Sequence, residues 1–229
     1  MKASITKIVL IIITLLIREG IGFCQGFVDL DFESAQIIPY TSSPIPNAIA
    51  VSNALPGWSV YFGTSQQMVI NYNDPATGST WVSLMATNGG QISGNYSVLL
   101  QGGGTASAAI ITQTGVVPVD TKSLLFEAEP GPVVAAGSLV VSLGGQNIMF
   151  SALSTGSNYT LYGGNIPLAF AGQSEQLTFS ALEQSGLNVN NWTVDDIQFS
   201  PSVVPEPGVA GLLGLGSLLF GLCRWKKIA

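Results

Sequence analysis

Histidine is absent from this chain of 229 residues, and cysteine occurs only as Cys24 and Cys223. Without imidazole, neither a Ser-His-Asp triad, a Cys-His pair nor a histidine-ligated zinc site can be built. Both cysteines lie in terminal segments, so the region between them has no disulfide and its stability must come from its core. Carboxylates remain as acid–base groups, as in glycoside hydrolysis by two paired acids. Because arginine and lysine are too scarce to tune such a pair, we expect no enzymatic activity.

Basic residues are nearly absent from the body of the protein, residues 27–200. Lys122 is its only basic residue against eleven acidic ones, a formal net charge of −10. An acidic surface of this kind repels nucleic acid and anionic lipid. We therefore exclude nucleic acid as a partner, and the charge fits an extracellular, cation-rich setting. The length of the body suffices for a single domain with a sizeable core.

The N-terminal segment has the composition of a secretory signal peptide. Lys2 and Lys7 precede an apolar run at residues 8–17, which is too short to span a membrane. We assign residues 1–26 to the signal peptide and expect the mature chain to begin near residues 25–27. Cys24 raises the alternative of a lipoprotein, but an aromatic residue stands before it where a lipoprotein signal requires a small one.

The C-terminal segment, residues 201–229, contains a proline-rich triad followed by an apolar run. Pro205, Glu206 and Pro207 cannot continue a helix or a sheet, because proline fixes φ and lacks the N–H, so the triad forms an extended, accessible hinge. Residues 208–223 predict a transmembrane helix. A helix of this length extends over about 24 Å, which is short of the roughly 30 Å of hydrocarbon in a bilayer. We therefore expect a poorly matched span rather than a permanent anchor.

Three basic residues, Arg224, Lys226 and Lys227, follow the predicted span and hold the C-terminus on the cytoplasmic side. The triad, span and basic cluster, over about residues 203–229, resemble the PEP-CTERM sorting signal of bacterial exported proteins. The resemblance implies that an exosortase-type transpeptidase recognises the triad. It also implies that the protein resides transiently in the inner membrane before it reaches the cell surface or extracellular matrix. The alternative is an ordinary C-terminal anchor whose prolines merely end the globular domain.

Short runs of alternating apolar and polar residues, separated by Gly, Asn, Ser and Pro clusters, recur along the body. This pattern predicts an all-β fold of about ten or eleven strands, a single β-sandwich or jelly roll over residues 27–200. The expected strands are 28–32, 58–62, 68–72, 81–86, 96–101, 109–113, 124–128, 139–143, 147–151, 177–181 and 192–199. Turns are expected at 88–90, 102–104, 144–145 and 163–164, of which 144–145 has the composition of a tight hairpin turn.

Two acidic clusters lie at opposite ends of the body. Asp29, Asp31 and Glu33 alternate with apolar residues, so we expect all three carboxylates on one face of the first strand. At Asp195 and Asp196 the alternation of the last strand changes phase, which predicts a bulge or kink. If the two strands lie side by side, Glu33 and one of these aspartates would meet around a structural Ca²⁺, which takes oxygen ligands. The alternative is a solvated acidic edge that blocks pairing with other chains.

The same two segments resemble the beginning and end of galactose-binding-like β-sandwich modules, a fold shared by many carbohydrate-binding domains. The resemblance rests on residues 32–33, 56–58 and 194–199. It implies a structural calcium held by Glu33 and by Asp195 or Asp196. Many such modules hydrogen-bond sugar hydroxyls through arginine or histidine, and this body contains neither.

A glycan site also needs flat aromatic rings that stack on sugars. Trp58 and Trp192, each beginning a strand next to turn residues, are the candidates that we expect to be partly exposed. The sequence favours a non-catalytic, secreted surface protein of an extracellular polysaccharide matrix, targeted and processed through its C-terminal signal. A carbohydrate-binding, lectin-like module with a structural calcium is the alternative.

Overall fold

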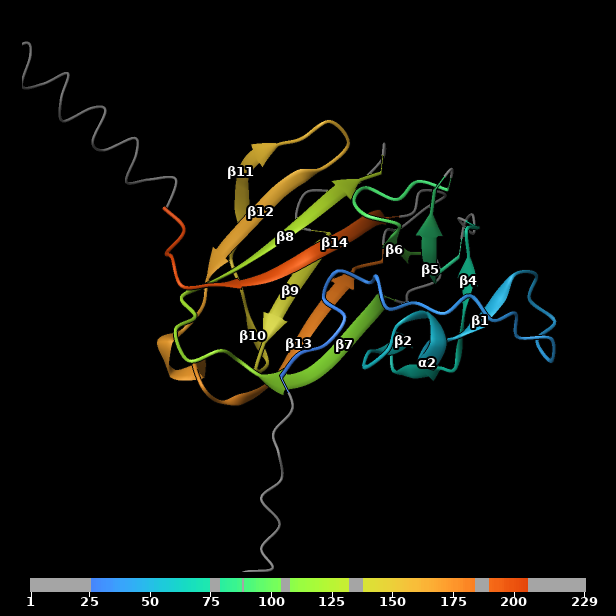
Figure 1. Ribbon diagram of the computed structural model, residues 1–229, viewed down its shortest axis with the longest axis horizontal. Helices are drawn as coiled ribbons and strands as arrows, with labels where there is room; N and C mark the ends of the chain where they lie inside the picture. Colours follow the sequence, from blue (N-terminus) through green and yellow to red (C-terminus); the bar gives the residue numbers. More distant parts are fainter. Residues whose placement is uncertain are drawn as a thin grey trace, which may run out of the picture.

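The computed structural model describes residues 26–74, 79–87, 89–103, 108–131, 138–183 and 190–205. Within them the chain forms two β-sheets and little helix (Figure 1). The predicted all-β, two-sheet fold is confirmed. The predicted signal peptide, apart from Gly26, and the predicted transmembrane helix lie outside the described residues.

One sheet has eight strands and the other has six, and most neighbouring strands are antiparallel. The eight-stranded sheet has the order β1 (Ala48–Ala50), β4 (Val69–Tyr72), β5 (Trp81–Ala86), β6 (Tyr96–Gly102), β14 (Asn190–Ser200), β8 (Ser123–Pro130), β12 (Thr160–Asn165) and β11 (Ser151–Thr155). The six-stranded sheet has the order β10 (Gln146–Asn147), β9 (Leu139–Leu143), β13 (Ser174–Ala181), β7 (Ala109–Val116), β2 (Ser59–Phe62) and β3 (Ser65–Gln67). Two short helices, α2 (Val51–Ala54) and η1 (Leu168–Phe170), complete the described elements.

Both sheets contribute apolar side chains to one core. In β9 the buried positions are Leu139, Val141 and Leu143, which follow the period of two expected for a strand with one buried face. Phe126 of β8 and Phe179 of β13 meet edge to face with ring centroids 5.2 Å apart, joining the two sheets. The core therefore lies between the sheets.

Most of the predicted strands are present with small shifts at their ends, and the prediction of β5 at residues 81–86 is correct at both ends. The predicted hairpin turn at Gly144 and Gly145 is also confirmed. Both residues have positive φ, 56° and 76°, and they join β9 to β10 in antiparallel register. Such a two-residue turn requires left-handed backbone that glycine adopts without strain.

Two of the predictions in the region of residues 147–165 are wrong. The strand expected at 147–151 is divided, since β10 belongs to one sheet and β11 to the other, and the chain crosses between them. The turn expected at Gly163 and Gly164 is part of β12, a strand that the pattern missed. At Gly164 a Cβ atom would lie 2.4 Å from the carbonyl oxygen of Met149, so glycine permits this close approach rather than a turn.

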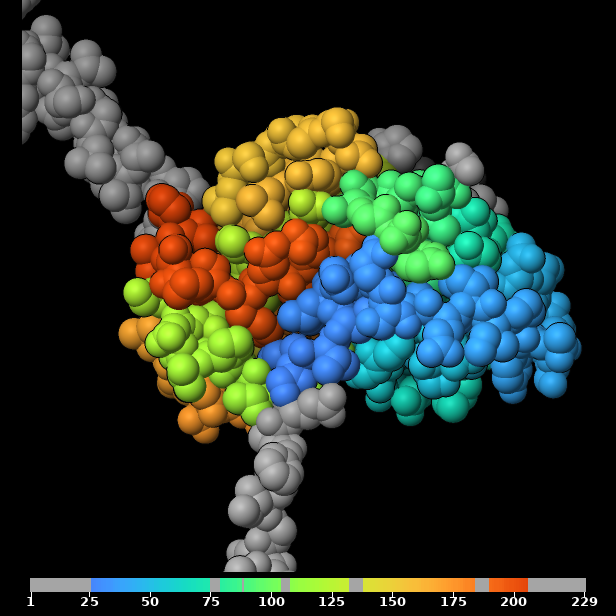
Figure 2. All heavy atoms as spheres, in the orientation of Figure 1, coloured from blue at the N-terminus to red at the C-terminus, as the bar shows by residue number. Residues whose placement is uncertain are grey.

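The strand expected at residues 28–32 is also wrong. Residues 30–34 form a turn, with φ of 50° at Asp29 and 56° at Phe32, so Asp29, Asp31 and Glu33 do not share one strand face. Instead, the N-terminal segment (residues 26–38) contacts β7 of one sheet and β14 of the other, and Figure 2 shows these blue residues on the surface beside the red residues of β14. The alternation of apolar and acidic residues at 28–33 therefore belongs to a turn that buries Phe32, and not to a strand.

Hydrogen bonds to both sheets fix the N-terminal segment. The side-chain amide of Gln113, in β7, accepts from Val28 N–H at 2.6 Å and donates to Val28 C=O at 2.9 Å. On the other sheet, Ile197 N–H of β14 donates to Leu30 C=O at 3.0 Å. The first and last segments of the body therefore do lie side by side, although the first is not a strand.

Candidate functional sites

A bulge in β14 positions the two C-terminal aspartates, as the change of phase predicts. Asp195 pairs with Glu127 of β8 and Gln198 pairs with Leu125, so two residues, Asp196 and Ile197, face a single residue between those pairs. Asp196 has a φ of 42°, the left-handed conformation that such a bulge uses. The prediction of a bulge at Asp195 and Asp196 is confirmed.

Asp195 is 2% exposed and is hydrogen-bonded through both carboxylate oxygens. Its Oδ2 accepts from Ser97 Oγ at 2.6 Å, and its Oδ1 accepts from Asp196 N–H at 2.7 Å. Burial raises the pKa of Asp195 to about 7, the two hydrogen bonds oppose this rise, and the charges of Glu127 and Glu33 add to it. Three acidic groups from distant parts of the chain therefore influence one another here.

Glu127 is the second buried acid of this group. Its side chain is 8% exposed, and its Oε2 is buried without a hydrogen-bond partner. The carboxylate of Glu127 favours the protonated form of the Tyr159 hydroxyl and so raises the pKa of Tyr159. Because Glu127 and Asp195 are paired across antiparallel strands, both side chains lie on the same face of the eight-stranded sheet.

Glu33 is held by a loop rather than by β14. Its Oε1 accepts from the N–H groups of Asn95 at 2.6 Å and Tyr96 at 3.1 Å, and its Oε2 accepts from Asn95 Nδ2 at 2.7 Å. Burial opposes the ionised form, but these hydrogen bonds outweigh it and lower the pKa of Glu33. Asp196 Oδ2 accepts from Gln198 Nε2 at 2.6 Å.

The predicted calcium ligands Glu33, Asp195 and Asp196 are thus neighbours, but each has a partner within the protein. No group of three acidic side chains among the described residues is arranged to hold a metal ion. Calcium binding at this group stays a prediction. The sequence did not indicate Glu127 or Ser97, because their proximity to Asp195 depends on the register of β14 with its neighbours rather than on any local motif.

Trp58 and Trp192 are buried, and the prediction of their partial exposure is wrong. Trp58 is 4% exposed and its Nε1 donates to Asp29 C=O at 3.0 Å. Trp192 is 7% exposed and its Nε1 donates to Ser138 Oγ at 2.8 Å. Their polar atoms are satisfied internally, as is usual for buried tryptophan, so neither ring offers a stacking face to solvent.

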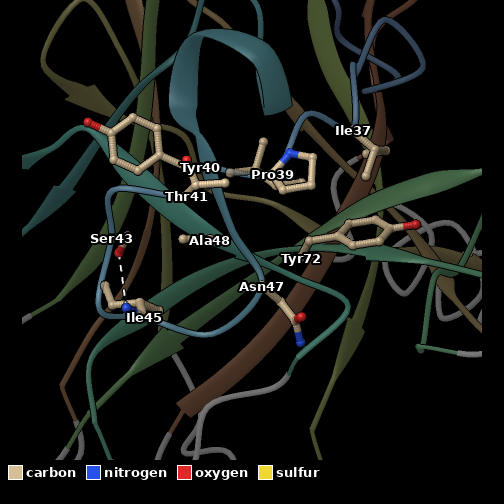
Figure 3. A pocket seen from close by; sticks show the side chains of 10 residues that line it. Ile37, Pro39, Tyr40, Thr41, Ser43, Ile45, Asn47, Ala48 and Tyr72 are labelled. Carbon is tan, nitrogen blue, oxygen red and sulfur yellow. Dashed lines mark hydrogen bonds between the residues drawn. The ribbon is translucent and has the colours of Figure 1, made fainter.

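An exposed ring, Tyr40, and a partly buried one, Tyr72, occur instead at a hollow of about 280 Å³ between the segment preceding β1 and the end of β4. Figure 3 shows Tyr40 and Tyr72 on its two sides, with Ser43 and Asn47 also at its lining. Backbone bonds from Tyr40 N–H to Ala48 C=O and from Tyr72 N–H to Asn47 C=O fix this region. The lining combines rings with neutral hydrogen-bonding groups and contains no charged side chain.

The end of the described chain is fixed to the body immediately before the triad. Asn165, at the end of β12, accepts from Val204 N–H through Oδ1 at 2.7 Å and donates to Val204 C=O through Nδ2 at 2.9 Å. Val204 is buried and Pro205 is exposed. Of the sorting residues, Pro205 is therefore placed at the surface, whereas Glu206, Pro207 and the basic cluster lie outside the described residues. Over the part of the chain that the structure covers, no helix has the length and hydropathy needed to cross a membrane.

Taken together, these features define an all-β, two-sheet protein with a buried acidic group. No family model matches the chain, and no curated protein does. Among solved structures the chain is similar to the secreted serine protease VesC from Vibrio cholerae, with 10% identity and a TM-score of 0.31 over 69% of this chain and 44% of that one. The chain thus spans less than half the length of that protein.

Proposed function

We propose that this protein is an exported, non-catalytic component of the bacterial cell surface or extracellular polysaccharide matrix. In this proposal its C-terminal PEP-CTERM signal targets it to the membrane, where an exosortase-type transpeptidase processes it. The observation that carries the proposal is the position of Pro205, exposed and directly after the fixed Val204. A processing enzyme that recognises Pro205, Glu206 and Pro207 would meet a motif that begins at the body surface.

The positions of the acidic side chains support a role without catalysis. A retaining or inverting glycosidase requires two carboxylates separated by about 5 to 10 Å across an open cleft. Asp195 and Glu127 are buried side by side on a sheet face. The hollow beside Tyr40 and Tyr72 contains no acid.

The sorting proposal is tested by replacing Pro205, Glu206 and Pro207 with alanine in the exporting bacterium. We expect full-length protein to accumulate in the membrane fraction, because the recognised residues are gone while the predicted span remains. Pro201→Ala is the matched control, since it removes an exposed proline just before the triad. Unchanged processing and release of the triple variant would contradict the proposal, as fractionation and immunoblotting would reveal.

The second candidate function is carbohydrate binding by a jelly-roll module with a structural calcium at Glu33 and Asp195 or Asp196. The hollow beside Tyr40 and Tyr72 favours it, because rings with neighbouring hydroxyl and amide groups match the faces and hydroxyls of sugars.

A glycan array with the detergent-solubilised protein distinguishes this candidate from the first. Binding that is lost in Tyr40→Ala and retained in Tyr61→Ala, a tyrosine of β2 outside this hollow, would support a glycan site. An array without any positive glycan would remove the candidate while leaving the sorting proposal intact.

A further inference from the structure

Exposed apolar side chains gather where the described chain ends. We call this surface the exit face and define it by Met149, Leu153, Leu168, Val203 and Pro205. Met149 is 87% exposed, and a Cβ atom at Gly163 would touch both Leu153 and Val204, which places Leu153 beside the fixed end of the chain. In Figures 1 and 2 the red C-terminal residues lie at the left side of the body. Met149, Leu153 and Val203 therefore lie beside the end of the described chain, and Leu168 follows Pro167, which lines the same hollow as Met149 and Pro205.

A shallow hollow of about 670 Å³ occupies the exit face. Met149, Phe150, Ile166, Val204 and Pro205 contribute to its lining, and no charged residue does. The body as a whole has a net charge of −10 and should repel anionic lipid, so contact with lipid requires an uncharged region of this kind. The hollow on the exit face therefore presents no acidic side chain of its own.

The only basic residue of the body lies beside the same surface. Lys122 lines an adjoining hollow with Leu168 and Pro201, next to Asp120. Its backbone N–H donates to Ser200 C=O at 2.8 Å, so Lys122 is fixed to the last residue of β14. A lysine near an anionic membrane surface is attracted to it. Lys122 therefore provides a positive charge beside the exit face, with Asp120 next to it.

The chain length sets how far the exit face can move from a membrane. Val204 is fixed by Asn165, and the predicted span begins at Gly208. Four residue steps of fully extended chain reach at most about 14 Å. A headgroup layer is roughly 5 to 8 Å thick. Any inserted tail therefore keeps the exit face within a short distance of the headgroups.

We propose that the exit face is a docking surface for lipid: in the anchored precursor, Met149, Leu153, Leu168 and Val203 lie against the outer surface of the bilayer. This inference rests on the proposed function, because it requires that the C-terminal segment inserts. Its consequence is that the body is held in one orientation, with the triad at the lipid surface.

The test uses fluorescence quenching on the full-length protein reconstituted in vesicles of phosphatidylethanolamine and phosphatidylglycerol. An environment-sensitive fluorophore is attached at Met149→Cys or Leu168→Cys, in a background with Cys24→Ser and Cys223→Ser. Met68→Cys is the matched control. Met68 is 74% exposed and precedes β4, which lies near the opposite edge of the eight-stranded sheet from β11. A fourth sample has Cys24→Ser as its only substitution, so that its label is on the native Cys223, within the predicted span.

We expect doxyl-labelled lipid to quench the label at residues 149 and 168, with a blue shift of emission, and to leave the label at residue 68 unquenched. Equal emission and equal absence of quenching at 149, 168 and 68, with Cys223 quenched, would overturn the docking surface alone. An unquenched label at Cys223 would overturn the insertion on which the proposed function depends. Because all three body positions are highly exposed, their substitution should not impair folding.

Discussion

Asp195 occupies an unusual environment for a carboxylate. It is almost completely buried and lies opposite Glu127 of the neighbouring strand, on the same face of the sheet. Its pKa of about 7 means that the folded protein retains a proton between roughly pH 4 and pH 7, where the unfolded chain has released it. The free energy of unfolding contributed by Asp195 is therefore fully present below about pH 4 and is lost as pH rises through 7. The difference from the ordinary value of 3.8 corresponds to on the order of 4 kcal/mol at most.

Asp195→Asn should remove this dependence. We expect the variant to be more stable than the wild type at pH 8 and to differ little from it at pH 4, because asparagine keeps an acceptor for Asp196 N–H without a charge. Asp196→Asn is the control, and it should retain the wild-type pH dependence. Urea denaturation in the presence of a chelator, from pH 4 to pH 8, measures the free energy of unfolding of each protein. An identical dependence of this free energy on pH for Asp195→Asn and the wild type would contradict the prediction.

Calcium would reverse the sign of this dependence. A bound cation favours the ionised form of Asp195, so stability in excess CaCl₂ would rise with pH and chelation would lower the melting temperature. A melting temperature that is unchanged between excess calcium and excess chelator would exclude the predicted site at Glu33, Asp195 and Asp196.

At the scale of elements, one fully buried side chain of the N-terminal segment belongs to the core. Phe32 is fully buried against Trp58, with ring centroids 5.7 Å apart, although it lies in a turn. Phe32→Ala should lower the free energy of unfolding by about 3 to 5 kcal/mol, the range for large core truncations. Ile38→Ala, in the same segment but exposed, should change it by less than about 0.5 kcal/mol. A loss below about 1 kcal/mol for Phe32→Ala would show that the segment contributes little to the fold.

Some elements of the fold could be predicted from the sequence and others could not. Strands with one buried face, such as β9, were predictable because their alternation reflects burial directly. The bulge at Asp195 and Asp196 was predictable because it shifts that alternation by one residue. The turn at residues 30–34 has the same alternation of apolar and acidic residues, although Phe32 has positive φ. The sequence pattern alone does not distinguish this turn from a strand.

The acidic group was predictable only in part for a related reason. Glu33, Asp195 and Asp196 stand out as local clusters in the sequence. Glu127 joins them through the pairing of β8 with β14, which is a property of the whole sheet. The burial of Trp58 and Trp192 is likewise decided by packing between distant elements, since tryptophan at a strand end is compatible with either environment.

At the scale of the whole molecule, charged and apolar side chains are unevenly distributed over the surface. The acidic charge of the body should oppose its approach to anionic surfaces, while the exit face and Lys122 lie near Val204 and Pro205, where the predicted sorting segment begins. We therefore interpret the body as a stable two-sheet domain that is carried to the membrane in a defined orientation and then released from its tail.

The most direct test of this account is the intact mass of the protein recovered from the extracellular matrix of the producing bacterium. We expect a chain that begins near residues 25–27 and ends at or near Pro205, Glu206 and Pro207, without the apolar run and the basic cluster that follow. Recovery of matrix protein that still carries Arg224, Lys226 and Lys227 would contradict processing at the triad.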